Sequence, residues 1–131
     1  MNNRRSFIIG LKSLKLSAKE RIFLKEFKPW GVILFARNIK NIKQASNLTS
    51  SIRKIFNDRK YPILIDQEGG RVNRLKNLIS FDNLTSEFFG NKYINDLKEF
   101  KIYYKLFIDK TSYLLRSIGA NINTVPVLDL R

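Results

Sequence analysis

The sequence predicts a single α/β domain with parallel strands, and three features indicate this class. The unbroken apolar run 30–35 and the stretch 62–66, which is apolar up to Ile65, are typical of strands buried on both faces. Apolar residues recur every three or four positions over 42–56 and 96–118, as they do in amphipathic helices. Every connection between the expected strands is long enough for a right-handed crossover between parallel strands. Periodicity alone leaves two architectures open, a doubly wound sheet and part of a (β/α)₈ barrel.

The first half of the chain is expected to alternate strands and helices. Ser17 and Glu20 have the spacing of a capping box, which predicts the start of the first helix, and Pro29 predicts its end. Asn41 is placed to cap the second helix. The expected elements are a strand over 7–10, a helix over 17–27, a strand over 30–35 and a helix over 41–56.

The second half continues this alternation, and Gly119 is well placed as the C-terminal cap of its long helix. The expected elements are a polar turn at 57–60, a strand over 62–66, a polar segment from 67 to about 83, a helix over 96–118 and a strand over 121–127. One side of the long helix is expected to face the core, formed by Leu97, Phe100, Tyr104, Phe107, Leu114 and Ile118.

Composition excludes several classes of active site. The 131 residues include 25 Lys and Arg, 11 Asp and Glu, and neither Cys nor His. Without Cys there is no disulfide framework, no thiolate metal site and no cysteine nucleophile. Without His there is no Ser-His-Asp triad, no imidazole general base and no ordinary zinc site. Carboxylate, amine or hydroxyl chemistry remains, as does binding alone.

The net charge of +14 also suggests a basic binding protein. Such a charge favours nucleic acid or an anionic membrane surface as partner. The lysines are scattered without a block of like charges, so a Lys-, Ile- and Asn-rich composition is the simpler interpretation. No apolar run approaches the roughly 20 residues of a membrane span, and Arg4-Arg5 only faintly resembles an export signal. We expect a cytoplasmic protein whose main partner is not nucleic acid.

A cluster of polar residues begins where the third strand is expected to end. The stretch 66–74 reads DQEGGRVNR, and ligands of parallel α/β proteins bind at the carboxyl ends of strands. Asp66 can accept hydrogen bonds from hydroxyls, and Arg71 and Arg74 can bind a hydroxyl, a carboxylate or a phosphate. The same residues also have a purely structural interpretation, in which Asp66 caps a turn, the two glycines make it, and Glu68 pairs with Arg71.

Asp66 and Glu68 could alternatively be the two carboxylates of a glycosidase. Residues i and i+2 can reach the roughly 6.5–9.5 Å that separates an inverting pair. The nearby arginines would keep both carboxylates ionised, however, which does not suit a general acid.

Three motifs together resemble a known family. Residues 29–38 read PWGVILFARN, residues 66–74 read DQEGGRVNR, and residues 125–130 read VPVLDL. In this order and at this spacing they resemble the N-terminal part of a bacterial β-N-acetylhexosaminidase of glycoside hydrolase family 3, of the peptidoglycan-recycling type. The second motif is the most specific of the three, and the segment from Leu75 to about Tyr93 is more diverged.

The resemblance implies that residues 1–131 form the N-terminal half of a (β/α)₈ barrel, with about four β/α units. It also implies an enzyme family that needs no cofactor. The family removes terminal N-acetylglucosamine from muropeptides with retention of configuration. By resemblance, Asp66 and Arg74 bind the sugar, Glu68 and Arg71 shape the loop, and the role of Asp129 is open.

The resemblance also implies that catalytic residues are missing from these 131 residues. The family uses an Asp nucleophile after a later strand, a His held by an Asp as acid/base, and a substrate-binding Lys-His pair. With no His in the chain, we expect no catalytic residue and no glycoside hydrolysis by residues 1–131 alone. The open edges of a half-barrel favour self-association. A non-catalytic sugar-binding or assembly module and a basic nucleic-acid or membrane-surface binder remain the alternatives.

Overall fold

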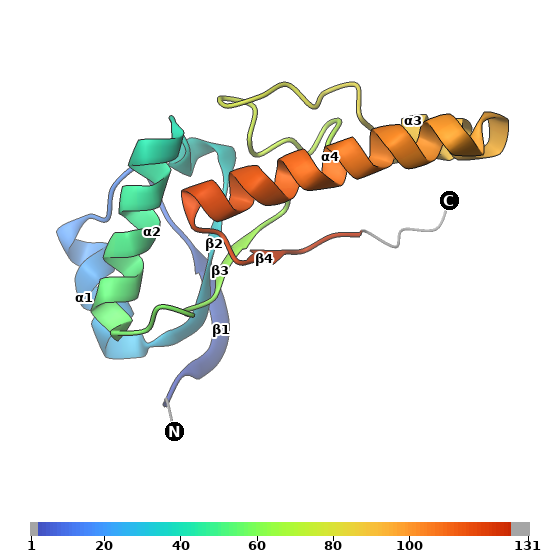
Figure 1. The fold of residues 1–131 in the computed structure, drawn as a ribbon. Helices are drawn as coiled ribbons and strands as arrows, with labels where there is room; N and C mark the ends of the chain where they lie inside the picture. The colour runs from blue at the N-terminus through green and yellow to red at the C-terminus, as the bar shows by residue number, and fades with distance from the viewer. Residues whose placement is uncertain (1–2, 127–131) are drawn as a thin grey trace.

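Residues 3–126 are described by a computed structural model, in which four parallel strands form one sheet and helices cover it (Figure 1). The strands are β1 (Arg5–Gly10), β2 (Pro29–Leu34), β3 (Ile63–Ile65) and β4 (Ile122–Asn123). The helices are α1 (Ala18–Phe27), the short 3₁₀ helix η1 (Ala36–Asn38), α2 (Ile42–Phe56), α3 (Ser86–Asn95) and α4 (Leu97–Ile118). The predicted α/β class is confirmed.

The strand order decides between the two architectures that periodicity left open. Neighbouring strands pair in chain order, β1-β2-β3-β4, and all three pairs are parallel. A doubly wound sheet reverses its order at a switch point, whereas consecutive barrel strands do not. Right-handed crossovers then place the helices on one face of the sheet, where α1 packs beside α2 and α2 beside α4. The arrangement is that of consecutive barrel units, and the sheet does not close within residues 3–126.

The hydrophobic core lies between the sheet and this helix layer. All three residues of β3 are buried, as expected for a strand covered on both sides. Ile8 on β1 is 44% exposed, because no element covers that position of the edge strand. The largest fully buried apolar side chains are Tyr61, Leu11, Leu24, Leu34, Ile39, Ile52, Ile63, Ile65, Leu75 and Ile118.

The predicted helix caps are present. The hydroxyl of Ser17 accepts a hydrogen bond from the N–H of Glu20, and the Glu20 carboxylate accepts one from the N–H of Ser17. Asn41 accepts a hydrogen bond from the N–H of Gln44 at 2.8 Å. Gly119 ends α4 with φ at 80°, in the left-handed region that favours glycine. Each of these caps acts through contacts within about one helical turn.

Helix α3 is an element that the sequence analysis did not predict. Its N-cap is Thr85, whose hydroxyl accepts a hydrogen bond from the N–H of Phe88 at 3.0 Å. The run Thr85-Ser86-Glu87, a capping residue followed by an acid in the first turn, was the available signal. The segment before it is irregular as predicted, yet it buries Leu75 and Phe81.

Two further expectations are corrected at the C-terminal side. The last strand is only Ile122–Asn123 rather than 121–127, and residues 127–131 lie outside the described residues. On α4, Phe107, Leu114 and Ile118 are buried as predicted, whereas Leu97 is 47% and Tyr104 40% exposed. The first half of α4 extends past the sheet and has α3 beside it (Figure 1).

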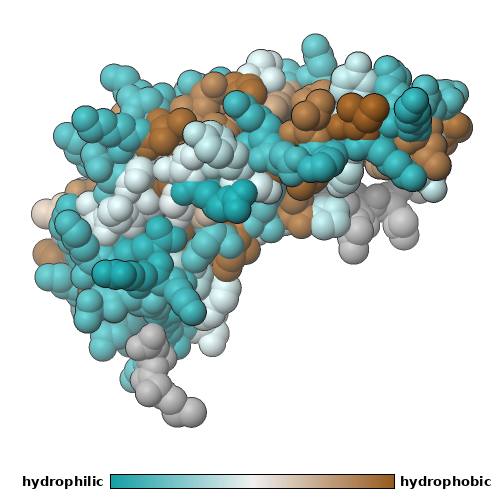
Figure 2. Space-filling model, in the orientation of Figure 1, coloured by the Kyte–Doolittle hydropathy of each residue, from teal (hydrophilic) through white to brown (hydrophobic). Residues whose placement is uncertain are grey.

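The uncovered part of α4 changes the character of the surface. Hydrophobic side chains gather along the α3–α4 end, while hydrophilic side chains predominate over α1 and α2 in this view (Figure 2). Exposed apolar residues there include Ile94, Leu97, Ile102, Tyr103 and Leu106. Among the described helices, none combines the length and the apolar character that crossing a membrane requires.

Candidate functional site

The segment that follows β3 folds back onto the end of that strand. Gln67 is 1% exposed, and its side-chain oxygen accepts hydrogen bonds from the N–H groups of Arg74 and Leu75 at 2.9 and 3.0 Å. Leaving buried backbone donors unpaired is costly, so a Gln at this position stabilises the return of the chain. The consequence is that Arg74, eight residues after Asp66, lies beside it.

A tight turn makes this return possible. Gly69 has φ at +92°, and a Cβ there would overlap the carbonyl oxygen of Leu84. Glu68 N–H donates to the carbonyl oxygen of Val72 at 3.2 Å, which closes the turn. Only glycine meets both the left-handed backbone and the close approach of Leu84.

Asp66 and Arg74 form an ion pair at the carboxyl end of β3. Nη2 of Arg74 lies 3.4 Å from Oδ2 of Asp66, and the two side chains are 28% and 30% exposed, respectively. The hydroxyl of Thr124, which follows β4, donates to Oδ1 of Asp66. Nε of Arg74 is buried without a hydrogen-bond partner among residues 3–126. The structure therefore brings together Asp66 and Arg74, the two residues predicted from the sequence to bind the ligand, and leaves both side chains partly exposed to solvent.

A second arginine completes this edge of the sheet. The guanidinium of Arg37 lies 4.4 Å and that of Arg74 5.3 Å from the ring centroid of Phe35. Nε of Arg37 donates to the carbonyl oxygen of Leu11 at 2.8 Å, which anchors the side chain to the segment after β1. The sequence analysis assigned no role to Arg37, although its position three residues past β2 puts it at the same edge.

One carboxylate, two guanidinium groups and one hydroxyl thus meet at the carboxyl ends of β2, β3 and β4. Asp66 can accept hydrogen bonds from two hydroxyl groups, and Arg74 can donate to a third oxygen. This donor and acceptor set suits an uncharged polyhydroxylated ligand. Between 3 and 126 no group of three or more acidic side chains is placed to hold a metal ion.

Glu68 and Arg71, the other charged residues of the 66–74 motif, do not join the ion pair of Asp66 and Arg74. Arg71 is exposed, Glu68 is half-buried, and neither takes part in an ion pair within the described part of the chain, so the Glu68–Arg71 pair of the alternative, structural interpretation does not form. Glu68 lines a cavity whose lining does not include Asp66, so the two carboxylates of the alternative glycosidase pair do not face that cavity together. Asp129, whose role was open, lies outside the described residues.

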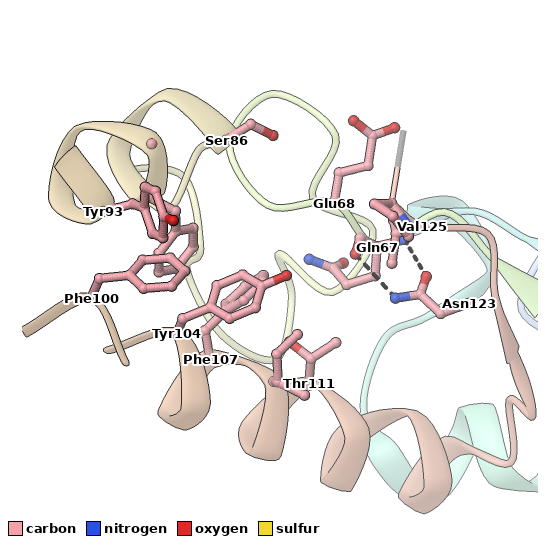
Figure 3. A pocket seen from close by; sticks show the side chains of 14 residues that line it. Gln67, Glu68, Ser86, Tyr93, Phe100, Tyr104, Phe107, Thr111, Asn123 and Val125 are labelled. Atoms are coloured by element: carbon pink, nitrogen blue, oxygen red, sulfur yellow. Dashed lines mark hydrogen bonds between the residues drawn. The ribbon is translucent and has the colours of Figure 1, made fainter. Parts of the chain in front are cut away.

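Two asparagines of the β4 segment, which the sequence analysis passed over, clamp the end of β3. Oδ1 of Asn123 accepts a hydrogen bond from the N–H of Gln67 at 3.0 Å, and Nδ2 of Asn123 donates to the Gln67 carbonyl oxygen at 3.3 Å (Figure 3). Oδ1 of Asn121 accepts from the N–H of Ile63 at 2.7 Å at the other end of the strand. Both side chains replace ladder hydrogen bonds where β4 is short, so no signal in the sequence alone marks them.

Known proteins are similar to this chain in sequence. The chain is 32% identical over 124 residues to a β-hexosaminidase of Xanthomonas euvesicatoria pv. vesicatoria, a match that covers 94% of this chain and 36% of that protein. Over 71 residues it is 42% identical to a β-hexosaminidase of Alkalilimnicola ehrlichii, which covers 53% of this chain and 20% of that protein. No family model matches the chain.

Solved structures share the fold. NagZ from Neisseria gonorrhoeae superposes with a TM-score of 0.82 at 26% identity, over 97% of this chain and 37% of that protein. A glycoside hydrolase family 3 β-N-acetylglucosaminidase from Paenibacillus superposes with a TM-score of 0.72 at 28% identity, over 95% of this chain and 23% of that protein. The chain spans a little over a third of the length of the first curated relatives that it matches. In sequence and in fold, it corresponds to the N-terminal part of the β-hexosaminidases of glycoside hydrolase family 3.

Proposed function

We propose that this chain supplies part of the sugar-binding site of a β-N-acetylhexosaminidase, and that Asp66 and Arg74 bind a terminal N-acetylglucosamine. The observation that carries the proposal is their ion pair at the carboxyl end of β3. Nη2 of Arg74 lies 3.4 Å from Oδ2 of Asp66, and both side chains are partly exposed to solvent. In this arrangement Asp66 accepts hydrogen bonds from neighbouring sugar hydroxyls. Arg74 donates to a sugar oxygen while its guanidinium stays over Phe35.

The names of the relatives support the choice of sugar. They are β-hexosaminidases, and one of the superposed NagZ structures, with a TM-score of 0.70 at 25% identity, was solved in complex with N-trifluoroacetyl-D-glucosamine. We extend the proposal to a muropeptide substrate, to peptidoglycan recycling and to the cytoplasm as its place of action. The resemblance of the 66–74 motif supports this extension.

Binding rather than hydrolysis is the activity we propose for residues 1–131 on their own. Glycoside hydrolysis needs two positioned carboxyl groups or an equivalent acid/base pair. Asp66 is paired with Arg74, and Glu68, the other acidic residue of the 66–74 motif, lines a cavity that does not include Asp66. The family's acid/base His is not among these residues, because the chain contains no His.

The test is a titration of the 131-residue chain with N-acetylglucosamine, followed by two-dimensional amide NMR. We expect weak, saturable shifts confined to residues around 66, 74 and 124. Asp66→Asn removes the charge that strengthens the hydroxyl hydrogen bonds, so the dissociation constant should rise at least tenfold. Asp109→Asn is the matched control, because Asp109 is an exposed residue of α4 whose ion-pair partner among residues 3–126 is Lys105 alone.

Two results would contradict the proposal. Equal affinity in Asp66→Asn and in the unchanged chain would remove Asp66 from the sugar site. Release of 4-nitrophenol from 4-nitrophenyl N-acetylglucosaminide by the purified chain would show that it carries catalytic groups of its own.

A further inference from the structure

A cavity beside Gln67 is separate from the ion pair of Asp66 and Arg74. We call it the aromatic cavity. It has a volume of about 500 Å³ and lies between α3, α4 and the segments that follow β3 and β4 (Figure 3). Small-molecule sites usually have volumes of roughly 300–1,000 Å³. Neither Asp66 nor Arg74 lines it, so the proposed sugar site does not account for it.

Packed aromatic rings form most of the wall. Tyr104 stacks on Phe100, with ring centroids 5.2 Å apart, and meets Phe89 edge to face at 5.1 Å. Phe107 lies against Phe89 at 5.2 Å. Because each ring is held by its neighbours, the cavity has flat, apolar sides that do not need to be ordered when a ligand enters.

Two polar groups of this wall have no partner within residues 3–126. Nε2 of Gln67 and Oγ1 of Thr111 are both buried and make no hydrogen bond, and the two residues are 1% and 4% exposed. The orientation of the Gln67 amide is set by its oxygen, which accepts from the N–H groups of Arg74 and Leu75. The NH₂ group therefore faces the cavity (Figure 3). Such buried unpaired groups cost free energy unless a ligand satisfies them.

The charge of the lining narrows the class of ligand. Among residues 3–126, no Lys or Arg lines this cavity, and the one charged residue of its lining is Glu68. An anion would find no cation there and would meet a carboxylate. A neutral ligand carries no such penalty.

We propose that the aromatic cavity binds a neutral aromatic compound that carries a carboxamide. The ring lies between the side chains of Tyr104 and Phe107 and their neighbours. The ligand carbonyl accepts a hydrogen bond from Nε2 of Gln67, and the ligand N–H donates to Oγ1 of Thr111. The ligand occupies a cavity that neither Asp66 nor Arg74 lines, and it differs from a sugar in having an apolar ring.

Benzamide is the probe, with two ligands of nearly the same shape as controls. Benzoate replaces the amide by a charged carboxylate, and acetophenone keeps the carbonyl without an N–H. In NMR titrations of the 131-residue chain, benzamide should shift the side-chain amide of Gln67 and the amides of α3 and α4. We expect benzoate to bind at least tenfold more weakly, and acetophenone about fivefold more weakly.

Two substitutions separate the roles of the polar groups. Thr111→Val removes an unpaired hydroxyl at constant shape, so the fold should persist, benzamide binding should weaken about fivefold and acetophenone binding should not change. Gln67→Glu keeps the oxygen that accepts from Arg74 and Leu75 but removes the donor, and should weaken both ligands. Ser117→Ala, on α4 but outside the cavity lining, should change neither.

The outcomes distinguish this site from the sugar site. Benzamide should leave the N-acetylglucosamine titration unchanged, and failure of sugar binding would leave the present inference standing. Absence of saturable benzamide binding would overturn it, as would equal binding of benzamide, benzoate and acetophenone. If Gln67→Glu does not fold, the Thr111→Val comparison of the two neutral ligands decides the question alone.

Discussion

The side-chain oxygen of Gln67 accepts a hydrogen bond from the backbone N–H of Arg74 at 2.9 Å. This one contact connects the end of β3 with the return of the chain after the turn at Gly69. It places Arg74 beside Asp66 and directs the Gln67 amide nitrogen into the aromatic cavity. Both proposed sites therefore depend on the same buried side chain.

Gln67→Met tests this dependence, because Met has a similar volume but no hydrogen-bonding oxygen. The Arg74 N–H would lose its acceptor, whereas the Leu75 N–H keeps a second one in Asn73 at 3.2 Å. We expect the free energy of unfolding to fall by about 1–3 kcal/mol, the usual cost of a buried unpaired donor. Urea unfolding measures it. A variant as stable as the unchanged chain would show that volume alone matters at this position.

The turn at Gly69 provides a second prediction. Gly69→Ala places a Cβ at φ +92° and against the carbonyl oxygen of Leu84. We expect a loss of about 2–4 kcal/mol in the free energy of unfolding, from backbone strain together with displacement of Leu84. Weaker binding of N-acetylglucosamine should accompany it, because the turn positions Arg74.

Gly90→Ala is the matched control for this substitution. Gly90 is an exposed residue of α3, and a Cβ there meets no atom within 4 Å. Since Ala is the better helix former, this variant should be more stable by roughly 0.5–1 kcal/mol. We therefore expect the free energy of unfolding to fall in Gly69→Ala and to rise in Gly90→Ala. A loss of stability in both variants would contradict the assignment of Gly90 to an open helix position.

Tyr61 makes the fold sensitive to alkaline pH. Burial raises the pKa of its hydroxyl from 10.0 to about 12, against the opposing effect of the nearby Arg4 charge. The neutral phenol, which donates to the carbonyl oxygen of Pro29 at 2.9 Å, is the form that the folded state favours. Its contribution to stability is therefore complete below pH 10 and is lost as the pH rises towards 12.

Tyr61→Phe isolates this contribution. The variant should lose about 1 kcal/mol at pH 7, because the hydrogen bond to Pro29 is removed while the ring can still stack on Phe56, 4.0 Å away between centroids. Between pH 10 and 12, its free energy of unfolding should depend less steeply on pH than that of the unchanged chain. The free energies of unfolding are measured with urea at each pH. If they change equally with pH in the variant and in the unchanged chain, the alkaline sensitivity belongs to other groups.

Much of the fold was predictable because its signals are local. The caps at Ser17, Asn41 and Gly119 act within one helical turn, and the apolar run of β3 predicts a buried strand without its neighbours. The position of Asp66 at the end of that run was likewise enough to predict a polar site, since the carboxyl ends of parallel strands converge.

Other features arise only when distant segments meet. The sequence by itself was enough to predict the α/β class, most helix ends and, through the family resemblance, Asp66 and Arg74 as candidate sugar-binding residues. The tertiary structure decided the chain-order sheet, the pairing of Asp66 with Arg74, the clamp of Asn123 on Gln67, and the aromatic cavity between α3 and α4. The physical reason is that periodicity and caps report interactions over a few residues. Hydrogen bonds such as that between Asn123 and Gln67 join residues 56 positions apart, where no local pattern marks them.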